Sequence, residues 1–166
     1  YARRLTATLP KALEVCYFVN SASEANELAI RLMKAYTKRT EIIVLEAAYH
    51  GHTNTLIDIS PYKHDGPGGT GAPDWVFTAP IPDDYRGPYK RSDPLAGKKY
   101  AQQVQEVIAR IQSQGRGLGG YIAETLPSVG GQIVLPPGNI FADTPAAKKG
   151  GKAPEPPGIG TPAMRP

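Results

Sequence analysis

Cysteine is almost missing from this sequence of 166 residues, in which Cys16 stands alone. A single cysteine excludes a disulfide within the chain and fits a reducing compartment, so we expect a cytoplasmic protein. Long apolar runs are missing too, since no stretch approaches the roughly 18 residues that a membrane-spanning helix requires. The first residues also lack the apolar core of a secretory signal. We therefore expect no membrane association and no secretion.

Charge of one sign is in only small excess, with 19 basic against 15 acidic residues and a net charge of +4. Half of that excess lies in residues 143–166, which hold four basic and two acidic residues among six prolines and four glycines. No basic stripe with interleaved aromatic residues is present, so we expect no nucleic-acid partner. Residues 143–166 cannot bury enough apolar surface to fold, which predicts a disordered tail after a folded unit of residues 1–142.

Apolar periodicity in residues 1–142 predicts helices and strands in alternation. Short β-branched or aromatic runs indicate strands, and apolar residues spaced three and four apart indicate helices. The expected helices are 2–13, 23–38, 53–59 and 100–114, the expected strands are 15–19, 41–46, 75–78 and 120–125, and 60–74 and 80–97 are expected loops. This order is typical of an α/β fold with a mainly parallel sheet covered by helices on both faces.

The most informative segment begins at Ser21, between an expected strand and an expected helix. Ser21 and Glu24 have the spacing of a capping box, in which two side chains satisfy free N–H groups at a helix start. That interpretation requires no ligand. A second interpretation is that the N–H groups of Ala22 and Ser23, with the Ser23 hydroxyl, bind a phosphate at the positive end of the helix. The residues alone leave both interpretations open.

Two further groups follow strands and are candidates for the same site, because ligands of open α/β sheets bind at the carboxyl ends of strands. Tyr49, which follows the second expected strand, offers a ring that could stack on a planar ligand, and His50 or His52 offers a hydrogen bond. Glu124 ends the fourth expected strand, ahead of a glycine-rich loop. Each could equally be an ordinary polar turn residue.

Several chemistries are disfavoured by the sequence. No serine lies in a G-x-S-x-G elbow, which argues against a serine hydrolase. Gly68–Gly71 does not lie between a strand and a helix, which argues against a dinucleotide-binding loop. His50 and His52 have no matching cysteine or carboxylate cluster, so we expect no metal site.

Taken together, these segments resemble the class III aminotransferases, which use pyridoxal phosphate on a fold type I scaffold. FVNSASEANELAIRL and AAYHGHT look like two motifs of that family. The longer stretches ISPYKHDGPGG, APIPDDYRGPY and IAETLPSVGGQIVLPPG look like the branch that contains the phospholyases of phosphoethanolamine and phosphohydroxylysine. The resemblance covers roughly residues 1–142, and it implies part of a three-layer α/β/α large domain.

The resemblance also implies roles for six residues in binding pyridoxal phosphate. Ser21, Ala22 and Ser23 would surround the phosphate, Tyr49 would stack on the pyridine ring with His50 beside it, and Glu124 would lie near the ring and the substrate. The family usually has glycine where this chain has Ala22. Because glycine allows closer backbone approach, we expect a modest loss of phosphate affinity from that methyl group.

The second departure from the family lies beyond residue 141. The resemblance implies an aspartate that pairs with the pyridine nitrogen and a later lysine that forms the Schiff base with the cofactor. The match fades at 141–143, and Lys148, Lys149 and Lys152 lie in the expected tail outside any recognisable lysine motif. We therefore assign no catalytic residue.

Two hypotheses about function remain open. The first is an enzyme of this family that transfers an amino group from a small amine or amino acid, or eliminates phosphate from a phosphorylated amine. The second is a non-catalytic fragment, truncated or frameshifted, that binds phosphate or cofactor weakly at most. The complete family forms homodimers, which we hold doubtful for such a fragment.

Overall fold

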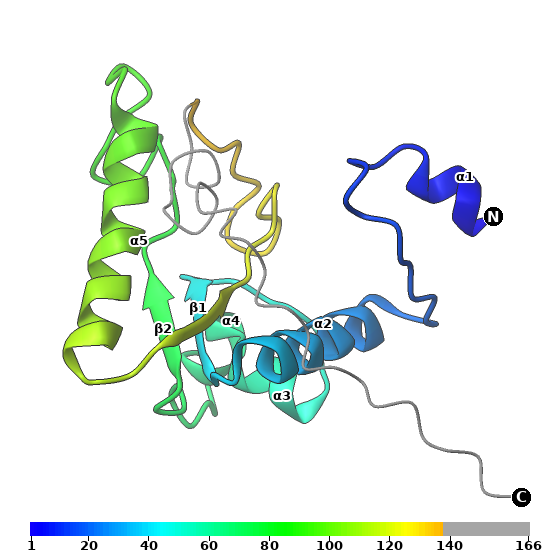
Figure 1. The fold of residues 1–166 in the computed structure, drawn as a ribbon. Coiled ribbons are helices and arrows are strands. Elements are labelled where there is room, and N and C mark those ends of the chain that lie inside the picture. The colour runs from blue at the N-terminus through cyan, green and yellow to red at the C-terminus, as the bar shows by residue number, and fades with distance from the viewer. Residues whose placement is uncertain (138–166) are drawn as a thin grey trace, which may run out of the picture.

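The computed structural model describes residues 1–137 and resolves eight helices and strands within them (Figure 1). In chain order they are α1 (Ala2–Thr6), α2 (Ala22–Thr37), β1 (Glu41–Leu45), α3 (Asn54–Asp58), α4 (Pro61–His64), β2 (Val76–Ala79), α5 (Ala96–Ser113) and β3 (Leu118–Tyr121). The expected tail at 143–166, and the boundary before it, lie outside the described residues. Both stay predictions.

The three strands form one parallel sheet with the order β2-β1-β3. In β1, every residue from Glu41 to Leu45 is buried, as expected for a central strand covered on both faces. The register pairs Ile43 with Phe77 of β2 and with Tyr121 of β3. The carboxyl ends of β1 and β3 are therefore neighbours at one edge of the sheet.

Alternate side chains of β1 enter two separate cores, one on each face of the sheet. Ile43 and Leu45 pack against α5, whose apolar stripe includes Val104 and Ile111. Ile42 and Val44 pack on the opposite face, against α2 and α3. Figure 1 shows α5 on one side of the sheet and α2 with α3 on the other. The predicted α/β/α layering and parallel sheet are confirmed.

The N-terminal segment differs from the expectation. The predicted helix at 2–13 is confined to Ala2–Thr6, and the predicted strand at 15–19 is wrong. Residues 15–19 pair with no strand among the described residues, and Val15 and Tyr17 are 74% and 64% exposed. An apolar run of strand length becomes a strand only where a neighbouring strand accepts its hydrogen bonds. In Figure 1 this segment lies apart from the sheet.

Three other boundaries were also predicted incorrectly. The expected loop at 60–74 contains the short helix α4, which Pro61 begins at the position where proline is favoured. Helix α5 begins at Ala96, inside the second expected loop. Strand β3 begins two residues before the expected 120–125 and ends at Tyr121, so Glu124 lies beyond it. A Cβ on Gly120 would collide with Met33 of α2, which explains why a strand position here is a glycine.

An ionic cluster joins the amino ends of the strands. Arg116, which precedes β3, donates from Nε to Glu41 Oε1 at 2.9 Å and from a terminal nitrogen to the backbone oxygen of Asp74 at 2.8 Å. Burial favours the neutral form of Glu41, but hydrogen bonds from its own N–H, from Arg116 and from Thr40 outweigh it and hold the carboxyl pKa below its usual value. The cluster therefore connects all three strands through charge.

We expect Arg116→Ala to lower the free energy of unfolding by about 2 kcal/mol, because it leaves the Glu41 carboxylate buried without its cation. The loss should shrink as the pH falls through the Glu41 pKa, since a carboxyl with a depressed pKa stabilises the fold only above that range. Urea unfolding followed in steps from pH 7 to pH 2 measures both effects.

Arg110→Ala is the matched control, because Arg110 and Arg116 both lie over the Phe77 ring, at 5.9 and 5.6 Å from its centroid. Of these two arginines, only Arg116 bonds Glu41 among the described contacts. Equal losses in the two variants would assign the effect to packing on Phe77 and contradict the ionic account.

Candidate functional site

The start of α2 has a variant capping box, in which Glu24 bonds the N–H of Asn20 instead of that of the N-cap residue Ser21. Ser21 Oγ accepts a hydrogen bond from the Glu24 N–H at 3.1 Å, and Glu24 Oε2 accepts one from the Asn20 N–H at 2.7 Å. The Ser21 hydroxyl is therefore used to cap the helix. This confirms the interpretation that requires no ligand, but it leaves the remaining donors of the first turn to be accounted for.

Those remaining donors are the N–H groups of Ala22 and Ser23, for which no acceptor occurs among residues 1–137. Beside them lies the Ser23 hydroxyl, whose oxygen accepts the His52 N–H at 3.3 Å and whose proton can still be donated. Ala22 does not have a positive φ, so its methyl group imposes no backbone strain here. The first turn thus offers three donors at the positive end of a helix of 16 residues.

Gly51 lets the loop after β1 reach this helix start. Its φ is +128°, and a Cβ there would lie 2.5 Å from Ser23 Oγ and 2.6 Å from Leu56 Cδ1. Only glycine combines that backbone conformation with that closeness. The contact fixes the loop after β1 directly against the first turn of α2.

His50 is held at both of its backbone groups. Its N–H donates to Ser60 Oγ at 2.9 Å, and its carbonyl accepts from Asn26 Nδ2 at 2.8 Å. Neither Asn26 nor Ser60 was expected at the site from the sequence. Asn26 belongs to the quoted SEAN segment and could have been found there, whereas Ser60 lies ten residues beyond His50 and gave no signal.

Glu124 lies three residues beyond β3, and its Oε2 accepts the Ser128 N–H at 3.0 Å. Its charge reaches His50, across the junction of β1 and β3. Burial of the imidazole lowers the pKa of His50 below its ordinary value of 6.5, and the Glu124 carboxylate opposes that shift. The structure therefore brings these two predicted residues into electrostatic contact.

Tyr49 is half-buried and stands between two ring neighbours. Its ring meets the Tyr62 ring edge-on, with centroids 6.2 Å apart, and its hydroxyl lies 3.5 Å from His52 Nδ1. Because the Ser23 hydroxyl bonds the backbone of His52, the aromatic group and the helix start belong to one constellation. All six predicted site residues thus lie at the start of α2 or just beyond the carboxyl ends of β1 and β3.

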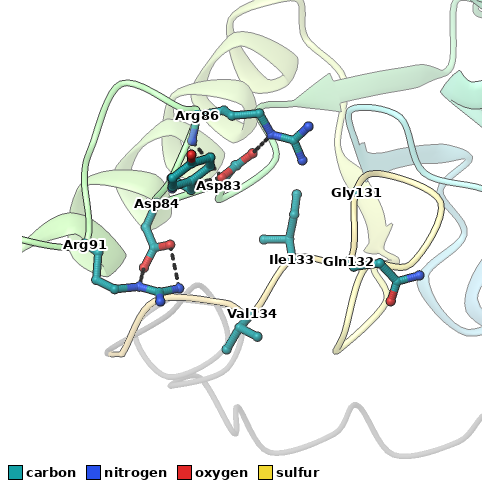
Figure 2. A pocket seen from close by; sticks show the side chains of 9 residues that line it. Asp83, Asp84, Arg86, Arg91, Gly131, Gln132, Ile133 and Val134 are labelled. Carbon is teal, nitrogen blue, oxygen red and sulfur yellow. Dashed lines mark hydrogen bonds and ion pairs between the residues drawn. The ribbon is translucent and has the colours of Figure 1, made fainter.

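A separate cavity of about 220 Å³ lies between the loop after β2 and residues 131–134 (Figure 2). Two ion pairs border it, Arg86 with Asp83 at 2.9 Å and Arg91 with Asp84 at 3.1 Å. None of the six predicted residues lines this cavity. The buried carboxylates already neutralise both guanidinium groups, and because all four residues lie between β2 and α5, these pairs stabilise the fold of that one loop.

Within residues 1–137 there is no group of three or more potential metal ligands. The helices of this part of the chain include none that is both long and apolar enough to cross a bilayer.

Comparison with known proteins places this arrangement in a family. The model of the family described as aminotransferase class III matches residues 1–144. This chain belongs to that family. Pyridoxal phosphate is the cofactor of its members, and one solved transaminase at 25% identity contains it.

Two curated relatives are close in sequence. The alanine–glyoxylate aminotransferase 2-like protein of Drosophila melanogaster is 44% identical, over 90% of this chain and 31% of its own length. The ethanolamine-phosphate phospho-lyase homolog 1 of Caenorhabditis elegans is 42% identical, over 86% of this chain and 32% of its own. The chain thus spans about a third of the length of these relatives.

A solved relative has the same fold. The phospholyase from Arthrobacter, determined in complex with phosphoethanolamine, matches with a TM-score of 0.73 and 29% identity, over 89% of this chain and 34% of that protein. Other structural neighbours are transaminases, such as the (S)-enantioselective omega-transaminase from Thermomicrobium roseum, with a TM-score of 0.68 and 25% identity. The expected fold type I scaffold is thereby confirmed.

The residues present fit the family cofactor. A phosphate requires several donors without acceptors of their own, and Ala22 and Ser23 provide them at a helix start. A pyridine ring requires an aromatic neighbour and a polar border, which Tyr49, His50 and Glu124 can provide. The imidazole Nε2 of His50 is buried with no hydrogen-bond partner in this part of the chain, which marks a polar position left for a further group.

We expect Gly51→Ala to lower the free energy of unfolding by about 3 kcal/mol, through positive-φ strain added to collision with the Ser23 and Leu56 side chains. Gly115→Ala is the matched control, since Gly115 has φ +70° with open space around its Cβ position. It should cost about 1 kcal/mol from the backbone alone. Equal losses in chemical denaturation would contradict a close approach at Gly51.

We expect the chain to lose stability as the pH falls below about 6.5, because the unfolded state then binds a proton that buried His50 resists. His50→Gln should flatten that part of the stability curve. Glu124→Gln should steepen it, because the opposing charge is removed. Thermal unfolding between pH 5 and pH 8 measures these slopes, with His52→Gln, at an exposed position, as the control; a slope unchanged by His50→Gln would contradict the assignment.

Proposed function

We propose that residues 1–137 provide the phosphate-binding and ring-binding part of a pyridoxal phosphate site. The first turn of α2 binds the cofactor phosphate through the N–H groups of Ala22 and Ser23 and the Ser23 hydroxyl. Tyr49 stacks on the pyridine ring, and Glu124 borders it on the substrate side. The observation that carries this proposal is the set of donors without acceptors at a helix start, fixed to the loop after β1 through Gly51.

The phosphate contact depends on donors that are already in place. Ser21 and Glu24 complete the helix cap, so the neighbouring N–H groups are aimed outward before any ligand arrives. The His52 N–H donates to Ser23 Oγ, so the hydroxyl proton of Ser23 can still be donated to a ligand. A ligand phosphate then binds without rearrangement of the turn, which lowers the entropic cost of binding.

The proposed reaction class is that of the family. Pyridoxal phosphate, when bound, supplies the electron sink that makes chemistry at the amine carbon possible. The relatives support two outcomes, transfer of an amino group and elimination of phosphate from a phosphorylated amine, because they include both an aminotransferase-like protein and a phospho-lyase homolog. Both outcomes act on a small amine or amino acid, and we propose that class of substrate for this site.

The lysine that attaches the cofactor is proposed to come from outside residues 1–137. Four lysines of this range have described side-chain contacts, none of them with a predicted site residue: Lys90 bonds the backbone of Tyr85, Lys99 pairs with Asp93, Lys34 lies over the Trp75 ring, and Lys63 lies over the Tyr62 ring. The alternative is that the chain binds phosphate or cofactor without catalysis. Binding by the chain is common to both, so it is tested first.

Binding can be measured by titrating the chain with pyridoxal phosphate and with pyridoxal, following absorbance of the ligand at equilibrium. We expect pyridoxal phosphate to bind at least tenfold more tightly, because a charge-assisted phosphate contact is worth about 1.5–3 kcal/mol. Inorganic phosphate should compete with it. Equal affinity for the two ligands would overturn the proposal.

Ser23→Ala tests the hydroxyl directly and should weaken binding of pyridoxal phosphate by about tenfold, with little effect on pyridoxal. Ser113→Ala is the matched control, because Ser113 caps the far end of α5, where its hydroxyl donates to the Arg110 carbonyl at 2.8 Å. An equal loss in the two variants would show that the effect is not local to α2.

A further inference from the structure

The sheet has an open edge along β2. Because the strand order is β2-β1-β3, β2 pairs with β1 on one side and with no strand of residues 1–137 on the other (Figure 1). An unpaired strand edge presents free N–H and C=O groups, to which an extended peptide can add as a further strand. Pro73 and Pro80 lie on either side of β2 and limit this edge to a short stretch.

Thr78 presents both of its backbone groups on the open edge. The Ile42 N–H donates to the Trp75 carbonyl and the Glu46 N–H to the Ala79 carbonyl, which are both bonds between β1 and β2. Because a parallel ladder uses alternate residues of each strand, residues 75, 77 and 79 face β1, and Thr78 faces away from it. Neither the N–H nor the carbonyl of Thr78 bonds another described residue.

A cavity of about 430 Å³ lies beside this edge, where Thr78 of β2 meets α5. Gln103 of α5 lines it with an Oε1 atom that is buried without a hydrogen-bond partner in the described part of the chain. A buried acceptor in that state lacks the donor that such groups normally have. The cavity therefore has room for a side chain and an acceptor that can receive its hydrogen bond.

The charges around the cavity favour a basic side chain. Glu46 and Glu106 both line it, and neither forms an ion pair within residues 1–137. Arg110 lines it as well, with its guanidinium group over the Phe77 ring at 5.9 Å from the centroid. Two carboxylates against one guanidinium group leave the cavity with a net negative charge.

We propose that the edge of β2 and this cavity form a docking site for an extended peptide segment of a partner protein that carries a basic side chain. One residue of the segment pairs antiparallel with Thr78 and exchanges both backbone hydrogen bonds with it. Phe77 and Ala79 point into the core beneath α5, so Thr78 and the residue opposite it point to the other face of the sheet. The next residue of the segment points towards α5, where its cation meets the carboxylates and Gln103 Oε1.

The charge requirement can be tested by fluorescence anisotropy, with a labelled peptide of threonine and serine that carries one central lysine. We expect this peptide to bind at least fivefold more tightly than the same peptide with a central glutamate. Glu106→Gln should weaken binding of the lysine peptide about threefold, because an exposed ion pair is lost. Gln103→Met should weaken it about fivefold, because the acceptor is removed while the side-chain volume is kept.

Glu14→Gln is the matched control, because Glu14 is an exposed carboxylate that does not line the cavity. It should leave the affinity for the lysine peptide unchanged. Equal effects of Glu14→Gln and Glu106→Gln would assign binding to general attraction between charges and overturn the proposal. Equal affinity for the lysine and glutamate peptides would also overturn it.

The strand pairing can be tested with two N-methylated forms of the lysine peptide. Methyl groups on the amide nitrogens of the residues that flank the lysine remove donors that face β2, and they should weaken binding at least tenfold. A methyl group on the amide nitrogen of the lysine itself, which faces away from β2, should change the affinity less than twofold. Equal effects of the two methylations would overturn the addition of a strand.

Sedimentation of the chain alone, over a range of concentrations, tests whether a second copy occupies the same edge. We expect the peptide to bind the chain without competing against self-association. Self-association that the lysine peptide reverses would identify a second copy as the occupant and overturn the proposal. None of these measurements uses a cofactor, so their outcome is independent of the proposed function.

Discussion

The close contact of Gly51 with Ser23 is the constraint on which the rest of the site depends. It joins the loop after β1 to the first turn of α2, two segments almost thirty residues apart, at a separation that no other residue type permits. Once they are joined, the His52 N–H reaches Ser23 Oγ and Asn26 reaches the His50 carbonyl. The donors at the start of α2 and the residues that follow β1 are therefore held in a fixed position relative to each other.

This arrangement is supported by β1, which is buried along its whole length and contributes to both cores. Because Ile42 and Ile43 point to opposite faces, a shift of one residue in register would exchange the two cores and displace the loop that follows. The pairing of β1 with β3 brings the Glu124 loop beside the His50 loop. The strand order of the sheet therefore determines which loops, and which of their charged residues, are neighbours.

Much of this was readable from the sequence, for physical reasons that differ between segments. The helix at 22–37 and the strand at 41–45 follow from periodicity, and the capping box from the Ser21–Glu24 spacing. The apolar run at 15–19 was wrongly predicted as a strand, because local composition cannot show whether a neighbouring strand is present to pair with it. The contacts of Gly51 and Ser60 with the site could not be foreseen, because each depends on a distant segment brought close by the fold, whereas Asn26 lies within the SEAN segment and could have been found there.

The donors at the start of α2 are backbone amides and a hydroxyl, none of which changes its charge near neutral pH. A phosphate held by such groups meets a binding surface whose own charge state is constant. The dependence of phosphate capture on acidity is then set by the second ionisation of the ligand rather than by the protein. The same turn would favour the dianion, and so it would select its ligand by charge without presenting a single cationic side chain.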